Sequence, residues 1–144
     1  MIDFGCHRIE VFANLFGTVR RVESIVSSEV FGREVEDTAS AIFQFESGAC
    51  ASLTVTHATT DARDTLDVYG TDGAIQIPSL NLGVMTIKTR DGERTESHPP
   101  TANFHEPLIE DFAKAVLLDR EPRVDGETGR EVSRLIEEIY AKGA

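Results

Sequence analysis

One histidine and two acidic residues near the start of the chain have types and spacing suited to proton transfer. Asp3 precedes His7 by four residues and Glu10 follows it by three, so a helix would place all three on one polar face. A carboxylate one helical turn from an imidazole can select its tautomer and stabilise its protonated form. The same spacing is common on solvent-facing helices, where an N-terminal Asp complements the helix dipole. Spacing alone favours this second interpretation.

A metal site is a third interpretation of the same residues. Asp3 and His7 would need a distant third ligand from the remaining histidines: His57, His98 or His105. Zinc sites usually show closely spaced ligands such as H-E-x-x-H, and the sequence has no such motif. We therefore predict no metal ligands.

Nucleotide-binding and nucleophile motifs are missing from the chain. Eleven glycines are present, yet none forms G-x-G-x-x-G or G-x-x-x-x-G-K-[ST]. Without a strand, a glycine-rich loop and a helix in succession, no helix N-terminus is offered to a dinucleotide pyrophosphate. A G-x-S-x-G element is also absent, which argues against acyl transfer by a serine triad. The sequence predicts no cofactor-binding residues.

Three segments have helical periodicity. The first is expected from about Asp3 to Phe16, with Gly17 ending it. The second begins near Pro107 and ends before Pro122. Its apolar stripe follows the i, i+3, i+4, i+7, i+8 spacing: Ile109, Phe112, Ala113, Val116 and Leu117.

The third helix repeats the same spacing near the end of the chain. Thr128 and Glu131 have the spacing of a capping box at its start. Its stripe comprises Val132, Leu135, Ile136, Ile139 and Tyr140.

Strand periodicity dominates the middle of the chain. Residues 37–45 and 49–56 alternate large or small apolar residues with polar ones around a Glu46–Gly48 turn, which predicts a hairpin. Short turns between successive strands require antiparallel pairing. Further strands are expected at Val19–Ser28, Thr65–Tyr69, Ala74–Ile77 and Val84–Thr89.

These elements predict an α+β fold for residues 1–144, taken as a single domain. Helices with one apolar stripe need a sheet to cover it, so we expect an open, predominantly antiparallel β-sheet with helices packed on one face. One face of the central hairpin is rich in hydroxyls and unsuited to a packed core. We expect it to be solvated or pressed against another chain or domain; its residues are Ser40, Ser52, Thr54 and Thr56.

Composition restricts the partners of the chain. The formal net charge is -11, so phosphates would be repelled and neither nucleic acid nor an anionic membrane is an expected partner. No apolar run is long enough to cross a bilayer, and the first residues do not have the pattern of a signal peptide. Cys6 and Cys50 have no paired spacing, so we expect reduced, packed thiols and a cytoplasmic location.

Four segments together resemble one protein family. The opening DFGCHRIEVFANLFG resembles a signature of the Gfo/Idh/MocA oxidoreductases, in which an Asp-x-x-x-His helix opens the C-terminal domain. VEDTASAIFQFESGACASLTVT is similar to the central hairpin of that family, and LDVYGTDGAIQI to its following strands. NFHEPLIEDFAKAVLLDREPRVDGETGREVSRLIEEIY is similar to its closing helices. The order and spacing of these segments are more specific than any single one.

The resemblance implies roles for residues of the opening helix. His7 takes the position of the acid/base histidine of the family, Asp3 that of the preceding carboxylate, and Glu10 that of a second acidic residue expected to bind substrate. The implied reaction is hydride transfer between NAD or NADP and a sugar, polyol or cyclitol. The implied assembly is a homo-oligomer formed through the open sheet face.

The sequence also departs from the family pattern. The dinucleotide fingerprint, the Glu-Lys-Pro motif and the glycine-rich segment before the Asp are missing. The resemblance therefore implies a C-terminal substrate and oligomerisation domain without its Rossmann domain, which binds no cofactor and is inactive alone. A non-catalytic self-association module of the same fold is the alternative, and a metal-dependent enzyme using Asp3 and His7 is a weaker one.

Overall fold

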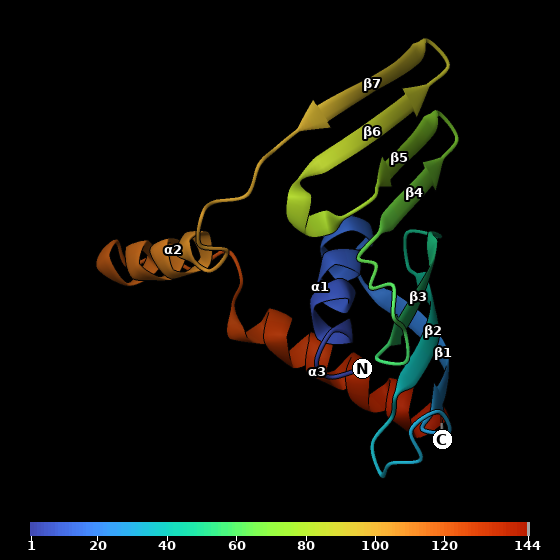
Figure 1. Cartoon of the computed structure of the whole chain (residues 1–144). Coiled ribbons are helices and arrows are strands. Elements are labelled where there is room, and N and C mark those ends of the chain that lie inside the picture. Colours follow the sequence, from blue (N-terminus) through green and yellow to red (C-terminus); the bar gives the residue numbers. More distant parts are fainter. Residues whose placement is uncertain (144) are drawn as a thin grey trace. The chain divides into compact units, whose positions relative to one another are not determined.

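The computed structural model describes residues 1–143, in which three α-helices and seven β-strands are found (Figure 1). The strands form two sheets, with the orders β1-β2-β3 and β4-β5-β6-β7. In chain order the elements are α1 (Gly5–Phe16), β1 (Val19–Ser27), β2 (Thr38–Phe45), β3 (Cys50–Thr56), β4 (Leu66–Gly70), β5 (Gly73–Ile77), a short 3₁₀ turn (Leu80–Leu82), β6 (Val84–Thr89), β7 (Gly92–Ser97), α2 (Glu106–Leu117) and α3 (Gly126–Gly143).

The chain divides into two compact units. Unit 1 comprises Met1–Thr59 and the described residues from Val124 onward, and unit 2 comprises Thr60–Arg123. Unit 1 holds α1, α3 and the three-stranded sheet, whereas unit 2 holds α2 and the four-stranded sheet. The assignment of the whole chain to one domain stays a prediction.

Every ladder between named strands is antiparallel, because the connections within each sheet are too short for a crossover. The central hairpin has the expected register, with Ala41 opposite Leu53. Its turn places Gly48 at φ 87°, a conformation that glycine adopts without steric cost. The predicted α+β class with open antiparallel sheet is confirmed.

The core of unit 1 lies between its sheet and the helices α1 and α3, which cover the same face (Figure 1). Phe43 on β2 is fully buried, and the ring of Phe12 on α1 meets it edge-on at 5.7 Å. Edge-to-face pairs of this kind add to the stabilisation from burial itself. The remaining core comes from α1, from alternate strand residues and from the α3 stripe: Ile9, Val22, Ala39, Ala41, Phe45, Leu53, Val132, Leu135, Ile136 and Ile139.

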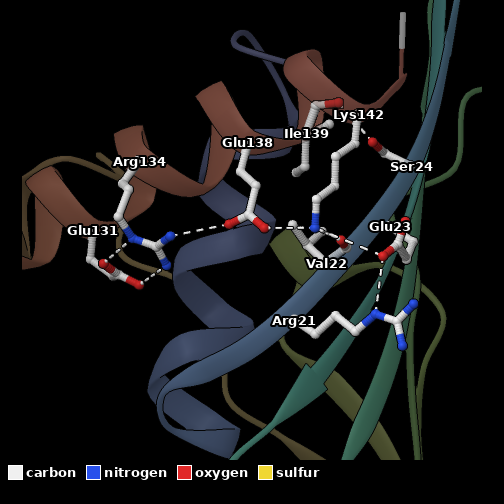
Figure 2. A network of polar contacts seen from close by, with 9 residues as sticks. All are labelled: Arg21, Val22, Glu23, Ser24, Glu131, Arg134, Glu138, Ile139 and Lys142. Carbon is white, nitrogen blue, oxygen red and sulfur yellow. Dashed lines mark hydrogen bonds and ion pairs between the residues drawn. The ribbon is translucent and has the colours of Figure 1, made fainter.

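A polar network at the edge of this core attaches α3 to β1 (Figure 2). Lys142 donates to the carbonyl of Val22 at 2.7 Å and to Glu138 at 2.8 Å. The hydrogen bond from Lys142 is the main reason that the pKa of Glu138 lies below its ordinary value. Ser24 donates to the carbonyl of Ile139 at 2.7 Å, so backbone groups of both elements are engaged. These contacts fix the rotation of α3 about its axis.

Unit 2 has little buried apolar surface. One face of its sheet carries six apolar side chains, all half-exposed: Leu66, Val68, Ile75, Ile77, Met85 and Ile87. The α2 stripe is exposed, with Phe112 at 61% and Leu117 at 82%, and Ala115 is the buried residue of this helix. Within unit 2, the sheet does not cover the α2 stripe, so the expectation that a sheet face covers this helix is wrong for that unit.

Two helix starts differ from the sequence prediction. α1 begins at Gly5, two residues later than expected, with the Gly5 amide bonded to the carbonyl of Met1. α3 begins at Gly126, where Asp125 accepts hydrogen bonds from the amide and the hydroxyl of Thr128 at 2.8 and 2.9 Å. Asp125 is therefore the N-cap, and Thr128 lies within the first turn instead of capping it.

The strand β7 was not expected from the sequence. It pairs with β6 from Thr89↔Gly92 to Val84↔Ser97. Its sequence, GERTES, contains no apolar residue and so gives no alternation to detect. An edge strand of charged residues is a common protection against further strand pairing.

None of the helices in residues 1–143 is long and apolar enough to cross a bilayer.

Candidate functional site

The three residues singled out by the sequence lie at the beginning of α1 in unit 1. His7 is exposed in the first turns of this helix, and Glu10 is half-buried one turn further on. Asp3 precedes Gly5, so it lies in the turn before the helix and not on its face. The roles of Asp3, His7 and Glu10 in catalysis or binding stay predictions.

The side chain of Asp3 approaches a histidine that the sequence analysis considered only as a metal ligand. The Oδ2 atom of Asp3 lies 4.0 Å from Nε2 of His57, which follows the last residue of β3. The ring of Phe4 packs on the same imidazole, with 5.0 Å between ring centroids. These residues are far apart in sequence and carry no shared motif. Only the packing of α1 beside β3 brings them together.

A small hollow lies behind His57. Asp37, at the entrance of β2, is only 3% exposed, and its Oδ2 accepts the amide of Phe31 at 3.0 Å. Its Oδ1 is the one buried side-chain oxygen or nitrogen in residues 1–143 without a hydrogen-bond partner. The hydroxyls of Thr38 and Thr56 are bonded to each other at 2.8 Å on the same rim. Asp37, which carries the unpartnered oxygen, and the two bonded threonines are all among the residues that line the hollow.

A second acidic residue beside this hollow has a structural role. Burial alone would raise the pKa of Glu36, but hydrogen bonds from the Met1 amino group and the Tyr140 hydroxyl hold it below its ordinary value. Burial and the bond to Glu36 raise the pKa of Tyr140 to about 12. The pair connects α3 to the segment that leads into β2, so it stabilises the wall of the hollow.

Neither a metal cluster nor a dinucleotide fold is visible in the described chain. No group of three or more His, Cys, Asp and Glu residues within residues 1–143 is arranged to hold a metal ion. The strand ladders there are all antiparallel, whereas a dinucleotide cradle needs parallel strands joined through a glycine turn and a helix. Cys6 and Cys50 are both free thiols, and Cys50 is exposed, so the expectation of a packed thiol is wrong for Cys50.

The geometry of unit 1 can support proton exchange and hydrogen bonding to a small polar molecule. The imidazoles of His7 and His57 are exposed, and imidazole is a common proton donor and acceptor in enzymes. Asp3 supplies a carboxylate in reach of one of them. Such groups suit proton transfer to or from a hydroxyl or carbonyl oxygen. Oxidation or reduction of that group would need a second component to accept or supply the electrons.

Comparisons with known proteins find dehydrogenases and oxidoreductases that this chain matches over part of their length. The sequence is 28% identical over 146 residues to D-xylose 1-dehydrogenase (NADP(+)) 2 of Haloferax volcanii, a match that covers 97% of this chain and 44% of that protein. Aldose-aldose oxidoreductase of Caulobacter crescentus, solved with glycerol, superposes with a TM-score of 0.85 at 25% identity, covering 98% of this chain and 44% of that one. An Agrobacterium radiobacter oxidoreductase solved with NAD+, L-tartaric acid and magnesium gives 0.84 at 16% identity, covering 98% and 46%.

The fold is thus that of one part of the oxidoreductases named above, and the chain spans less than half the length of the relatives that it matches. Residues 1–76, just over half of the chain, match the sequence model of the GFO/IDH/MocA C-terminal domain. The chain belongs to this family as one of its C-terminal domains. The family expected from the sequence is confirmed.

Proposed function

We propose that this chain is the substrate-side domain of an NAD(P)-dependent oxidoreductase that transfers hydride to or from a sugar, polyol or cyclitol. The observation that carries the proposal is the match along nearly the whole chain to a D-xylose 1-dehydrogenase, combined with an exposed His7 at the start of α1. Oxidation of a carbinol removes a hydride from carbon and a proton from oxygen. This domain would supply the proton acceptor, and the nicotinamide would take the hydride.

In this proposal His7 exchanges the proton with the substrate oxygen. Asp3 supports the imidazole electrostatically, and Glu10 accepts a hydrogen bond from a further substrate hydroxyl. General acid–base groups of this kind accelerate a reaction about 10²–10⁴-fold. NAD or NADP would be held by a Rossmann domain, supplied in the same polypeptide or by a partner, since hydride transfer depends on positioning of both reactants. The isolated chain is expected to bind neither cofactor.

A fusion enzyme tests the proposal directly. The part of the Haloferax volcanii relative that this chain does not match would be joined before Met1, and NADP+ reduction would be followed with D-xylose and a panel of polyols and cyclitols. We expect turnover by the fusion and a loss of about 100-fold or more in kcat for His7→Ala. His98→Ala, which changes an exposed histidine of unit 2, is the matched control. A fusion that binds NADP+ but oxidises none of these compounds, or whose rate survives His7→Ala, contradicts the proposal.

A self-association function is supported by a different observation. On the sheet face of unit 1 opposite the helices, Ile25 is 72% exposed and Ile42 is 62% exposed, among hydroxyl side chains. Large exposed apolar side chains on a flat sheet face favour an isologous contact with a second copy. The Ser40 and Thr54 hydroxyls on this face bond to each other at 3.0 Å, which lowers the cost of covering them.

Sedimentation experiments test this second function. We expect the wild-type chain to form a dimer or tetramer, and the double variant Ile25→Lys/Ile42→Lys to sediment as a monomer with an unchanged circular dichroism spectrum. A wild-type chain that stays monomeric at high concentration would rule the oligomer out.

We also propose a cytoplasmic location, which is supported by the free thiols of Cys6 and Cys50.

A further inference from the structure

His57 is held firmly on one side and open on the other. Its backbone amide donates to the carbonyl of Asp37 at 2.8 Å, which fixes the chain directly after β3. Phe4 lies against one side of its ring, and Asp3 approaches Nε2. Half of the His57 side chain and 55% of Phe4 remain exposed. The imidazole is therefore oriented by its neighbours while a large part of it stays accessible to a ligand.

The hollow behind His57 adds an independent sign of a ligand. It is lined by Phe4, Asp37, Thr38 and Thr56 among others, and its volume of about 10 Å³ is the room that one water molecule or hydroxyl group needs. The unpartnered Oδ1 belongs to Asp37, which is almost completely buried on this lining. Buried acceptors without a partner are rare in native proteins because desolvation costs about 1–3 kcal/mol. A hydrogen-bond donor on a bound ligand or water would satisfy the Oδ1 atom of Asp37.

These groups match the chemistry of a polyhydroxylated molecule better than that of an apolar or anionic one. The Phe4 ring offers an apolar surface to C–H groups, and the imidazole of His57 offers both a donor and an acceptor to hydroxyls. The carboxylates of Asp3 and Asp37 accept hydrogen bonds from hydroxyls but repel anions. Ligand sites commonly pair an aromatic surface with a few oriented polar groups in this way.

We propose that His57, with Phe4 beside it, is a substrate-binding residue that hydrogen-bonds one hydroxyl of the sugar or polyol. The same hydroxyl reaches the hollow at Asp37 directly or through one water. This inference rests on the proposed function for the class of substrate. His57 thereby sets the position of the ligand relative to the α1 residues, while the proton transfer itself belongs to His7. The contact should lower KM for the sugar and have a smaller effect on kcat.

Binding of D-xylose to the isolated chain is the first test, because it needs neither cofactor nor turnover. Amide signals would be followed by NMR during titration of the ¹⁵N-labelled protein with D-xylose, the substrate named for the Haloferax volcanii relative. We expect the largest shifts at Phe4, Asp37 and His57. His57→Ala should weaken the apparent affinity about tenfold, the equivalent of one hydrogen bond, and His57→Gln should recover most of the loss.

A histidine in unit 2 provides the control for the D-xylose titration. His98→Ala should leave the D-xylose titration unchanged, since His98 is an exposed residue of unit 2 that contacts Glu96. Unchanged amide shifts in His57→Ala outside the hollow show that the fold persists. The inference is overturned if D-xylose causes no shifts at Phe4 and His57, or if these shifts persist with equal affinity in His57→Ala.

Kinetics of the fusion enzyme separate this inference from the proposed function. His57→Ala should raise KM for D-xylose about tenfold and leave KM for NADP+ unchanged, whereas His7→Ala lowers kcat. A fusion that oxidises sugars with an unaltered KM in His57→Ala refutes the subsite and leaves the proposed function standing. Specific D-xylose shifts at His57 together with an inactive, NADP+-loaded fusion would refute the function and leave the subsite standing.

Discussion

The helices α2 and α3 have apolar residues at the same spacing, but the stripe of α3 is buried and that of α2 is exposed. In α3, Leu135 and Ile139 are completely buried against the sheet of unit 1. In α2, Phe112 and Val116 occupy the equivalent stripe positions and are 61% and 67% exposed. Intrinsic helix propensity and periodicity therefore do not distinguish the two. The difference arises because α3 packs on an apolar surface of β1 in its own unit, whereas no surface of unit 2 covers α2.

The comparison shows what an amphipathic pattern can predict. A stripe indicates that one side of a helix is suited to burial, but the burying surface has to come from elsewhere. For α3 that surface is supplied by alternate residues of β1, and polar contacts at Lys142 and Ser24 hold the helix in place. In unit 2 the sheet has an apolar face of half-exposed residues, and none of its strand residues is fully buried. Stability should accordingly be concentrated in unit 1.

The largest expected effect comes from truncating the same residue type in both stripes. Leu135→Ala should lower the free energy of unfolding by about 2–5 kcal/mol, because it removes buried methyl groups and leaves a cavity. Leu117→Ala should change it by less than about 0.5 kcal/mol, because that side chain is already in contact with water. Urea unfolding followed by circular dichroism measures both. Equal effects would mean that the α2 stripe is buried in solution.

Amide hydrogen exchange should separate the helices next. An isolated 12-residue helix without tertiary packing is marginal in water, so amides of α2 should exchange with little protection. Amides in the middle of α3 should become exposed only when the core of unit 1 unfolds. They should therefore exchange at least about 100-fold more slowly than the amides of α2. The measurement is exchange by NMR at neutral pH. Comparable protection in α2 and α3 would contradict the claim that α2 lacks the tertiary packing that α3 has.

A smaller effect is expected at the start of α3. Asp125→Ala removes the acceptor of the Thr128 amide and should destabilise the protein by about 1 kcal/mol. Asp125→Asn, which keeps a capping oxygen, should restore most of this loss. If Thr128→Ala were instead the more costly change, the cap predicted from sequence would be the correct one. Thermal unfolding of the three variants decides between them.

The smallest effect appears only at high pH. The pKa of Tyr140 is raised from 10.0 to about 12 by burial and by its bond to Glu36, so the neutral phenol is favoured in the folded state. Its contribution to stability is complete below pH 10 and is lost as the pH rises through about 12. The melting temperature of the wild type should therefore fall more steeply over this range than that of Tyr140→Phe. Parallel curves for the two proteins would show that this hydroxyl makes no such contribution.

Local sequence was sufficient where a pattern repeats over neighbouring residues. The hairpin of β2 and β3 was predicted because apolar and polar residues alternate on both sides of the turn at Gly48. β7 was not predicted, because pairing of a polar edge strand is decided by the free edge of β6 and not by its own composition. The α3 cap was misplaced for a related reason. Asp125 and Thr128 both have capping side chains, and the geometry of the first turn selects Asp125.

The candidate site was predictable only in part. The Asp3–His7 spacing is visible in the sequence, since it reflects neighbouring turns of one segment. The approach of His57 to Asp3 and Phe4 was not foreseen as a binding feature, because it joins the end of β3 to the turn before α1. The unpaired oxygen of Asp37 is equally invisible in sequence. A residue becomes an orphaned acceptor only after packing has removed its water.

The sequence by itself determined the family, the order of helices and strands, and the antiparallel pairing, because short turns and alternating residues act over a few positions. The tertiary structure decided which amphipathic surface is covered, which carboxylate meets which imidazole, and where an acceptor is left without a partner. These outcomes depend on contacts between distant segments, such as α3 with β1 and Phe4 with His57. Burial is a property of the assembled chain, whereas periodicity is a property of each segment alone.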